Sequence, residues 1–585
     1  MKCKIVRVSC LSSLALARAV MAVAVAGTVP LAARAEVPFS ALRFGSEFTT
    51  SANWPGMRAA LAKNRAAFDE VWFSTGVSFP PLAWHEERAR QCAAAADDLR
   101  RLGIVPSIEI QTIIGHTDEI LDSGDCTGQT WSTWVGCDGT VSKHVACPRD
   151  KRLAAYFARV AELHAAWKPG SIWIDDDVTL RNRAPMKNMS KALVGCFCDG
   201  CLAAFSEREN RQWTRPELSA AIRRHDGVEA RWWAFNAESL ATLAGAIVRA
   251  AHTVSPTTRF GYQFGWSWDP AIVKAMASAG GYLVRLRPGA GAYWDTDAHT
   301  QLDKAYFLQL VWRKYGALDC VEAVCPEIES CPRTFSCRTP QGIILEAFES
   351  LALGMDFLSM FVADARPANN PVAREDVKFY ADRLFPRLAS AHGFLKGYRD
   401  AGRGSRPCGF SVPDEHPARL VVCRGIPIAP AGGMSLGELP DVNSIPVRMS
   451  GSGTVTGPTR QTRVMQIASG PALMDFARRC DAASGGRLPV LFDEPVMAWV
   501  LPRVTDGWTL RTLAVVNASI DRQDPVGMRL RGVPDGAKAL WHTPESSAAE
   551  LSIVRDGGLS CVVLPRLGAW QCGYLEIVAT ENKGK

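Results

Sequence analysis

The 585-residue chain contains only ten histidines and no polar low-complexity tract. So few histidines argue against a hydrolase built on a catalytic metal, because such sites usually recruit imidazole ligands. No G-x-G-x-x-G motif follows the first candidate strand, which leaves a dinucleotide site without support. No internal repeat is present, and no segment after residue 35 is long and apolar enough to span a bilayer. We therefore expect a globular protein without a catalytic cofactor and without a membrane anchor.

The first 35 residues have the pattern of a secretory leader. A basic start precedes an apolar run from Ala19 to Leu31, and Ala33-Arg34-Ala35 fits the small-residue rule of signal peptidase. Cleavage after Ala35 removes five basic residues and no acidic one, which lowers the formal net charge from +7 to +2. We therefore expect an exported protein, periplasmic or extracellular. Its near-neutral charge gives no reason to propose nucleic acid or a membrane as a partner.

Short apolar runs alternate with helix-patterned stretches up to about residue 400, which is typical of a parallel α/β fold. Eight such strand–helix units fit a (β/α)₈ barrel with loop insertions. An open doubly wound sheet is the structural alternative. The expected strands cover residues 42–45, 70–74, 105–110, 171–175, 259–264, 282–286, 320–328 and 355–360.

The composition and the hydropathy pattern of the sequence change after about residue 405. Glycine-, serine- and threonine-rich stretches come first, and alternating runs such as Thr509–Val516 with turn residues between them then predict an antiparallel β-sandwich. The expected organisation is a leader at 1–35, a catalytic (β/α)₈ barrel at 36–405, a short α/β domain at 406–486 and a β-sandwich at 487–585.

Three consecutive acids end the fourth expected strand, in the sequence Trp173-Ile-Asp-Asp-Asp177. Side chains alternate along a strand, so Asp175 and Asp177 share one side unless the strand end is bulged. Crowding carboxylates in one place raises the pKa of at least one of them, as a general acid at neutral pH requires. The alternatives are helix capping and a cation site made of carboxylates. We expect Asp177 to be catalytic, and Asp175 and Asp176 to bind substrate.

A second acidic pair, Glu327 and Glu329, lies on one side of the seventh expected strand. A carboxylate there and one on the fourth strand would face each other across the mouth of a barrel. Retaining glycosidases need two carboxyl groups about 5–5.5 Å apart, one as acid/base and one as nucleophile. We expect Glu329 or Glu327 to be the nucleophile, and the alternative is a simple ion pair with Arg333 or Arg338.

Three thiols fall within six residues in Cys196-Phe-Cys198-Asp-Gly-Cys201. This spacing suits a tetrahedral Zn²⁺, and Cys147 is the best candidate for the fourth ligand, with Cys137 and Cys126 in reserve. Because export permits disulfides, pairing such as Cys126 with Cys137 is the alternative. Either arrangement would hold a loop in place, since a closed four-thiolate site leaves no position for catalysis.

A carbohydrate site typically combines aromatic platforms with a few hydrogen-bonding groups. Such groups occur close to the ends of several expected strands, and a core role is the alternative for each. The substrate-binding candidates are His116, Gln263, Trp266 and Trp294, with Glu109, Trp131, Trp134 and Tyr293 as weaker ones.

The string Ile174-Asp-Asp-Asp177, followed by Cys196-Phe-Cys198-Asp-Gly-Cys201, resembles the family 42 glycoside hydrolases, the β-galactosidases of clan A. In that family an Ile-Asp-Asn-Glu segment ends the fourth strand, and a zinc-binding Cys-x-Cys-x-x-Cys cluster follows. The resemblance implies a three-domain layout whose middle domain mediates trimerisation. It also implies Asp177 as acid/base, Asp176 in place of the asparagine that binds the 2-hydroxyl, and Glu329 or Glu327 as nucleophile.

The chain also departs from this pattern. The expected acid/base is an aspartate, one methylene shorter than glutamate, the 2-hydroxyl asparagine has become an aspartate, and the gap from Asp177 to Cys196 is longer. The sequence thus predicts a divergent retaining glycoside hydrolase that acts on β-linked glycans or glycosides, with a structural zinc and room for a homo-oligomer. An inverting carboxylate pair, a sugar-binding protein without catalysis, and a metal-dependent hydrolase using Asp175–Asp177 remain as alternatives.

Overall fold

The computed structural model describes residues 37–76, 79–116, 129–265, 269–289, 291, 293–295, 297–316, 318–330, 337–363, 380–411, 423–430, 432–440 and 470–579. The expected leader, Cys126 and Trp266 lie outside the described residues. Among the described helices, none combines the length and the apolarity that a bilayer span requires.

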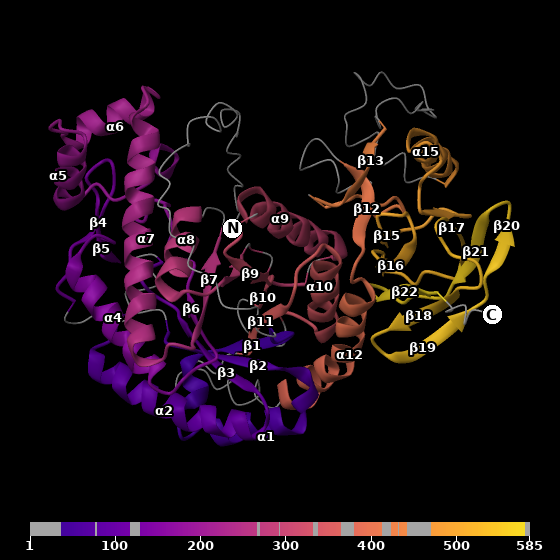
Figure 1. The fold of residues 1–585 in the computed structure, drawn as a ribbon, viewed down its shortest axis with the longest axis horizontal. Coiled ribbons are helices and arrows are strands. Elements are labelled where there is room, and N and C mark those ends of the chain that lie inside the picture. The colour runs from indigo at the N-terminus through magenta and orange to yellow at the C-terminus, as the bar shows by residue number, and fades with distance from the viewer. Residues whose placement is uncertain are drawn as a thin grey trace.

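A parallel sheet of nine strands forms the larger part of the molecule, in the order β10-β11-β1-β2-β3-β6-β7-β8-β9 (Figure 1). Its two end strands, β9 and β10, follow each other directly in the chain, so the seventh expected strand is split in two at Cys325 and Pro326. This confirms the eight expected strands of a (β/α)₈-type barrel. The strands are β1 Ser40–Phe44, β2 Glu70–Ser74, β3 Val105–Ile110, β6 Ser171–Ile174, β7 Arg259–Phe264, β8 Val284–Pro288, β9 Val321–Val324, β10 Glu327–Glu329 and β11 Leu358–Ala363.

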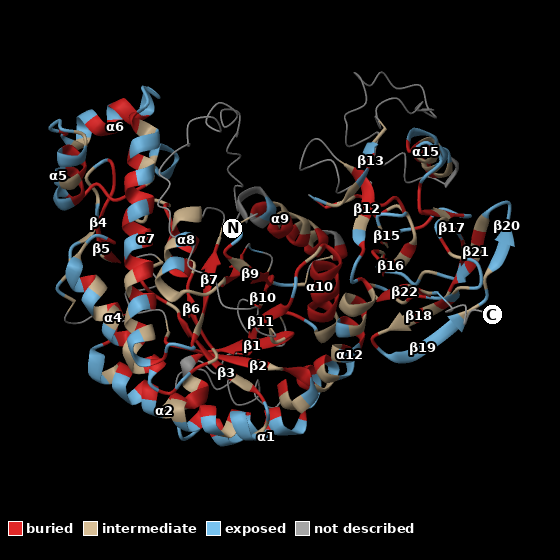
Figure 2. Ribbon diagram, in the orientation of Figure 1, coloured by how far each residue is buried: buried red, intermediate tan, exposed pale blue. Residues whose placement is uncertain are grey.

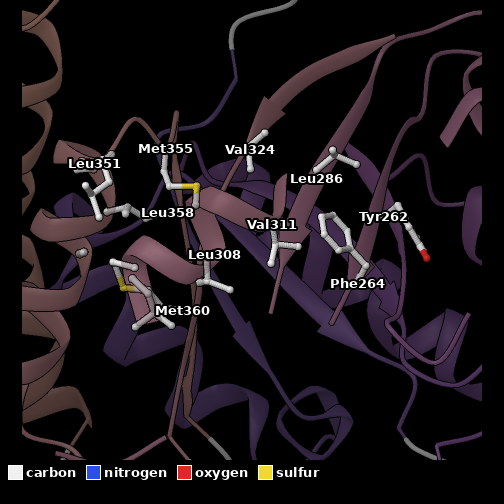
Figure 3. Packing of buried hydrophobic residues seen from close by; sticks show 14 of the residues in the cluster. Tyr262, Phe264, Leu286, Leu308, Val311, Val324, Leu351, Met355, Leu358 and Met360 are labelled. Carbon is white, nitrogen blue, oxygen red and sulfur yellow. The ribbon is translucent and has the colours of Figure 1, made fainter. Parts of the chain in front are cut away.

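Helices between the strands cover the outside of this sheet, with buried faces toward it and exposed faces toward solvent (Figure 2). Buried side chains of α9 and α10 and of the strands beside them make up part of this core (Figure 3). The barrel helices are α1 Trp54–Lys63, α2 Leu82–Arg101, α4 Lys151–Ala165, α7 Val228–Val254, α8 Pro270–Gly280, α9 Ala298–Gly316, α10 Pro340–Ala352 and α12 Phe385–Ala401.

The inside of the barrel holds a separate small apolar cluster built around two tryptophans. Trp72 and Trp173 stack with ring centroids 4.0 Å apart, and both are fully buried. Gly261 on the neighbouring strand β7 makes room for them, because a Cβ there would lie 2.1 Å from the Trp173 ring. Trp173 therefore points inward, and Asp175, two residues later, points to the same side at the end of the strand.

The insert after β6 carries two short helices, α5 Asp199–Arg208 and α6 Arg215–Arg223, which pack beside one end of α7 (Figure 1). Thr214 begins α6 with a capping box, in which its side chain and that of Glu217 each bond the other's backbone N–H. A two-stranded sheet of β4 Thr133–Val135 and β5 Val141–Ala146 lies in the insert after β3. Both inserts leave from carboxyl ends of barrel strands, the edge that carries the active sites of such barrels.

Two further sheets follow the barrel, one of seven strands in the order β13-β12-β15-β16-β22-β18-β19 and one of four in the order β14-β17-β21-β20. All their pairings are antiparallel except that of β12 with β13. β12 pairs with β15, so strands on both sides of the expected boundary at residue 486 share one sheet. The members are β12 Arg406–Ser411, β13 Met434–Glu438, β14 Val490–Phe492, β15 Ala498–Val504, β16 Leu510–Asn517, β17 Val526–Leu530, β18 Lys538–Thr543, β19 Ser546–Leu551, β20 Val554–Asp556, β21 Leu559–Leu564 and β22 Cys572–Val578, with helix α15 Gly470–Ala483 between β13 and β14.

Candidate active site

A buried layer of polar side chains closes the barrel at the carboxyl ends of its strands. Arg43, Glu109, Gln263, Arg287 and Glu327 come from five different strands, β1, β3, β7, β8 and β10, and none is more than 4% exposed. Burying such groups is costly unless they are paired and hydrogen-bonded. We therefore expect each of these five side chains to have a hydrogen-bonding partner within the layer.

The five side chains form a continuous hydrogen-bonded chain across the barrel. Arg43 donates to both oxygens of Glu109, at 3.1 and 2.6 Å, and Gln263 Nε2 donates to Glu109 Oε1 at 2.6 Å. Gln263 Oε1 in turn accepts from Arg287 Nε at 2.5 Å, and Arg287 Nη1 donates to Glu327 Oε1. A network in which every member has a partner is rigid, so these groups keep fixed positions at the barrel mouth.

Asp175 and Asp176 reach the same mouth from the end of β6. Arg287 Nη2 lies 3.7 Å from Asp175 Oδ1, while His116 Nε2 lies 3.1 Å from Asp175 Oδ2 and 3.4 Å from Asp176 Oδ1. The side chain of Asp176 is 30% exposed and that of Asp175 only 4%. Acids from the fourth and seventh barrel strands thus converge on one guanidinium, Arg287.

Because Asp175, Asp176 and His116 lie so close together, their pKa values are shifted in different directions. Burial and the neighbouring charge of Asp176 raise the pKa of Asp175 to about 7. Burial also acts to raise the pKa of Asp176, but the hydrogen bond from His116 and the charge of Arg287 lower it below its ordinary value. For His116, burial is outweighed by hydrogen bonds to the two aspartates, so its pKa lies well above the usual value and the ring is charged at neutral pH.

Asp177, the expected acid/base, bonds the backbone of the loop after β3. It is fully buried, and its Oδ2 accepts three backbone N–H groups, from Ile113 and Ile114 at 2.7 Å and from Gly115 at 2.6 Å. Three donors on one oxygen stabilise the loop that carries His116, as a capping carboxylate stabilises a helix start. Asp175 and Asp177 do not share one side, because the chain turns directly after β6 at Ile174.

Glu327, the first of the two glutamates on β10, belongs to the polar layer at the mouth. It is 4% exposed, bonds Arg287, and accepts a hydrogen bond from the Tyr293 hydroxyl at 3.2 Å. Burial raises the pKa of Glu327, and Arg287 opposes the shift. Glu329 is half-buried, and its backbone carbonyl accepts from Arg338 at 3.3 Å. In the alternative interpretation Glu327 or Glu329 pairs with Arg333 or Arg338; Arg338 forms its ion pairs with Glu346 and Asp295, and Arg333 lies outside the described residues.

The remaining substrate-binding candidates divide into two groups. His116 and Gln263 lie in the polar layer, whereas Trp294, next to Tyr293 in the chain, is 53% exposed. Trp134 is buried in the core. Trp294 is therefore an exposed aromatic side chain, adjacent in sequence to Tyr293, that a sugar ring could contact.

Arg43 and Arg287 are the central residues that the sequence reasoning missed. Each stands near the end of an apolar strand, where a charged side chain is costly to bury. Alternating arginines in Val284-Arg-Leu-Arg-Pro288 were a usable signal, because both point to the inside of the barrel. Arg285, one layer deeper, pairs with Glu322 at 2.8 Å.

Cys147, Cys196, Cys198 and Cys201 form a buried cluster in which all four sulfur atoms lie within 4.8 Å of one another. The Cys147 Sγ is 3.5 Å from that of Cys201 and 3.7 Å from that of Cys198. Four thiolates around one tetrahedral ion at the usual bond length have sulfur atoms about 3.8 Å apart, so the set fits a metal. None of the described cysteines forms a disulfide, and the alternative pairing of Cys137 with Cys126 involves a residue outside the described part.

A second set of ligand-type groups lies at the mouth itself. His116, Asp175 and Asp176 offer one nitrogen and two carboxylate oxygens within 4.8 Å of one another. The same three side chains are already joined by hydrogen bonds of His116 to both acids. Their geometry therefore serves either an ion pair or a divalent cation.

Removing the Asp177 carboxylate should destabilise the protein. Asp177→Ala leaves three buried N–H groups without an acceptor, so we expect the free energy of unfolding to fall by about 2–5 kcal/mol. The midpoint of urea unfolding, followed by tryptophan fluorescence, measures the change. Asp506→Ala, which removes an exposed carboxylate, is the control and should stay within about 0.5 kcal/mol of wild type. Equal stability of the two variants would contradict the anchoring role.

The fold, taken as a whole, is similar to that of several solved β-galactosidases. The cold-adapted β-galactosidase of Rahnella sp. R3 matches with a TM-score of 0.53 at 12% identity, over 92% of this chain and 98% of that one. The β-galactosidase of Bacillus circulans sp. alkalophilus matches with 0.53 at 11%, over 92% and 99%. A catalytic mutant of a family 42 β-galactosidase from G. stearothermophilus matches with 0.51 at 10%, over 92% and 98%.

No protein-family model matches the sequence, and no curated protein matches it either. The similarity to these proteins is therefore one of fold. At that level it confirms the resemblance that the acidic strand end and the cysteine cluster indicated. In fold, the chain is similar to the family 42 β-galactosidases.

Proposed function

We propose that the protein is a retaining glycoside hydrolase that acts on β-linked glycans or glycosides. The observation that supports this most is the convergence of Asp175 and Glu327 on the two sides of Arg287 at the barrel mouth. Acids from the fourth and seventh barrel strands thereby meet in the same buried polar layer, as a two-carboxylate mechanism requires.

In the proposed mechanism Glu327 attacks the anomeric carbon while the glycosidic C–O bond breaks and Asp175 gives its proton to the leaving oxygen. Asp175, now ionised, then takes a proton from a water molecule whose oxygen attacks the anomeric carbon, and the bond from that carbon to Glu327 breaks, which restores the Glu327 carboxylate and the Asp175 acid. Asp175 suits this role because its pKa of about 7 keeps part of it protonated at neutral pH. Asp177, to which the family resemblance assigns the proton, is held by three backbone N–H groups instead.

Arg287 and His116 contribute by holding the carboxylates in position. Arg287 bonds Glu327 and lies beside Asp175, so its charge limits the repulsion between two acids in one buried layer. His116 bridges Asp175 and Asp176 and is itself carried by the loop that Asp177 anchors. Both cations are therefore positioning groups, and neither forms a bond to the substrate during the reaction.

A metal-dependent hydrolase is the second candidate, because His116, Asp175 and Asp176 also form a set of ligand groups. In that case a chelator would abolish hydrolysis and an added divalent cation would restore it, while Glu327→Gln would have a small effect. The carboxylate mechanism requires the opposite pattern.

We further propose that the enzyme is exported, because the leader pattern would bring it to glycans outside the cell. The region 406–486 is the candidate for self-association.

Exchange of the proposed nucleophile should abolish activity. We expect Glu327→Gln to lower kcat/KM on the best of a panel of aryl glycosides by about 10³-fold or more, because no other group there forms the covalent intermediate. Glu329→Gln is the matched control two residues away, and we expect it to lose less than about tenfold. Circular dichroism verifies that both variants fold.

The reverse order of effects would move the nucleophile to Glu329. A folded wild type that binds sugars but hydrolyses no glycoside of the panel would instead indicate a sugar-binding protein without catalysis. Proton NMR of the first-formed product distinguishes retention from inversion, and an inverted product would exclude Glu327 as a nucleophile.

The pH profile tests the proton donor. Since Asp175 must carry its proton to act, and its pKa is about 7, kcat/KM should fall as the pH rises through this value. In Asp175→Asn the residual activity should lack this alkaline limb, whereas in Asp177→Asn the limb should remain. Initial rates between about pH 5 and 9 with an aryl glycoside measure both profiles. A limb that disappears in Asp177→Asn and remains in Asp175→Asn would assign the proton to Asp177.

We propose that the four-cysteine cluster holds one structural Zn²⁺. The ion would join the loop before α4, through Cys147, to the start of α5, through Cys198 and Cys201. Cys198→Ser should reduce the zinc content from about one ion per chain to a small fraction and lower the unfolding temperature. Elemental analysis and thermal unfolding measure the two effects, with Cys561→Ser, on β21, as control. Disulfide-linked peptides containing these four cysteines would contradict the proposal.

A further inference from the structure

Arg181 is a guanidinium at the barrel mouth that the mechanism above does not use. It follows the acidic strand end by four residues and packs against Gly265, at the end of β7, where a Cβ would lie 3.2 Å from its Nη2. Its charge interacts with the Asp176 carboxylate and with the Tyr293 hydroxyl. Arg181 therefore lies on the same rim as the proposed catalytic groups, above strands β6 and β7.

The other arginines of the mouth are already engaged. Arg43 bonds Glu109, and Arg287 bonds Glu327 and Gln263. Arg183 donates to the backbone carbonyls of His116 and Asp177, at 3.0 and 3.1 Å. Each of these three cations thus has a bonding role inside the protein.

Arg181 differs from them, because within the described part of the chain no residue accepts a hydrogen bond from its guanidinium or forms an ion pair with it. The side chain is half-buried, so a ligand can reach it. Burial and the like charge of Arg183 lower the pKa of Arg181, and Asp176 and Tyr293 only partly oppose this shift. A partly desolvated guanidinium without a hydrogen-bonded counter-ion is unfavourable, and an oxyanion from outside would supply those hydrogen bonds.

We propose that Arg181 binds an acidic substituent of the substrate, so that the natural ligand is an anionic sugar: a uronic acid or a sulfated sugar. This proposal rests on the proposed glycosidase site and names its substrate class. Both substituents present paired oxygens to which the planar guanidinium donates two parallel hydrogen bonds. Arg181 would contact a substituent of the sugar ring that Glu327 and Asp175 act on, since it packs against Gly265 directly after β7 and its charge interacts with Asp176 and Tyr293.

The test is a binding measurement, which does not depend on turnover. Isothermal titration calorimetry of the full chain compares methyl glycosides of glucuronic and galacturonic acid, and galactose 6-sulfate, with neutral methyl glucoside and galactoside. We expect wild type to bind at least one acidic sugar tenfold or more tightly than its neutral counterpart. Preference for the uronic acids or for the sulfate identifies which oxyanion is bound.

Arg181→Gln should reduce this preference to about twofold or less, because it removes the charge. Arg181→Lys should keep part of the preference, because the ammonium retains the charge but cannot donate the two parallel hydrogen bonds of the guanidinium. Arg159→Gln removes an exposed arginine of α4 that pairs with Glu162, and should keep the wild-type preference. Wild type that binds acidic and neutral sugars equally, or binds no acidic sugar at millimolar concentration, would overturn the inference. So would a preference that survives in Arg181→Gln. Selective binding of acidic sugars without any hydrolysis would uphold the inference while the glycosidase proposal fails.

Discussion

The charge of Arg287 is the constraint on which the barrel mouth depends. Two acids from different strands, Asp175 and Glu327, lie in one layer that is almost closed to solvent, and like charges in such a place repel strongly. Arg287 contacts both, and Gln263 holds the guanidinium in position from β7. Without this cation the acids would be protonated or would turn away, and the mouth would offer no pair of reactive carboxyls.

The inserts after β3 and β6 are held against the barrel at two points. Asp177 bonds three backbone N–H groups of the first insert, and the four-cysteine cluster draws both inserts together farther from the axis. A site that positions His116 through a loop needs such support, since a loop alone is less rigid than a strand. An acid directly after the end of β6 thus has a structural role in this chain.

The arrangement of charges also bears on what the mouth can accept. The carboxylates of the layer are matched by Arg43, Arg287 and His116, whereas Arg181 stands at the rim without a partner in the described part of the chain. A substrate that carries its own negative charge would complete the set of pairs, and a neutral sugar would leave Arg181 exposed.

Much of the architecture could be predicted from local sequence. The eight expected strands are confirmed because each is a short apolar run bounded by turn residues, and this pattern needs no distant contact to be recognised. Helices such as α4 and α7 were predictable for the same reason, from their apolar period. The split of the seventh strand at Cys325 and Pro326 was not, since it depends on pairing with two different neighbours at the two ends of the sheet.

For the site, the sequence by itself determined which acids stand at strand ends and which cysteines lie close in the chain. Only the tertiary structure decided which of three consecutive aspartates faces the mouth, because the backbone turns directly after Ile174 and the alternation of side chains stops there. It also decided that Glu327 meets Arg287, which reaches it from another strand, 40 residues away in the chain. Charge pairs across a barrel are set by the register of neighbouring strands, and that register is a property of the closed fold rather than of any local sequence.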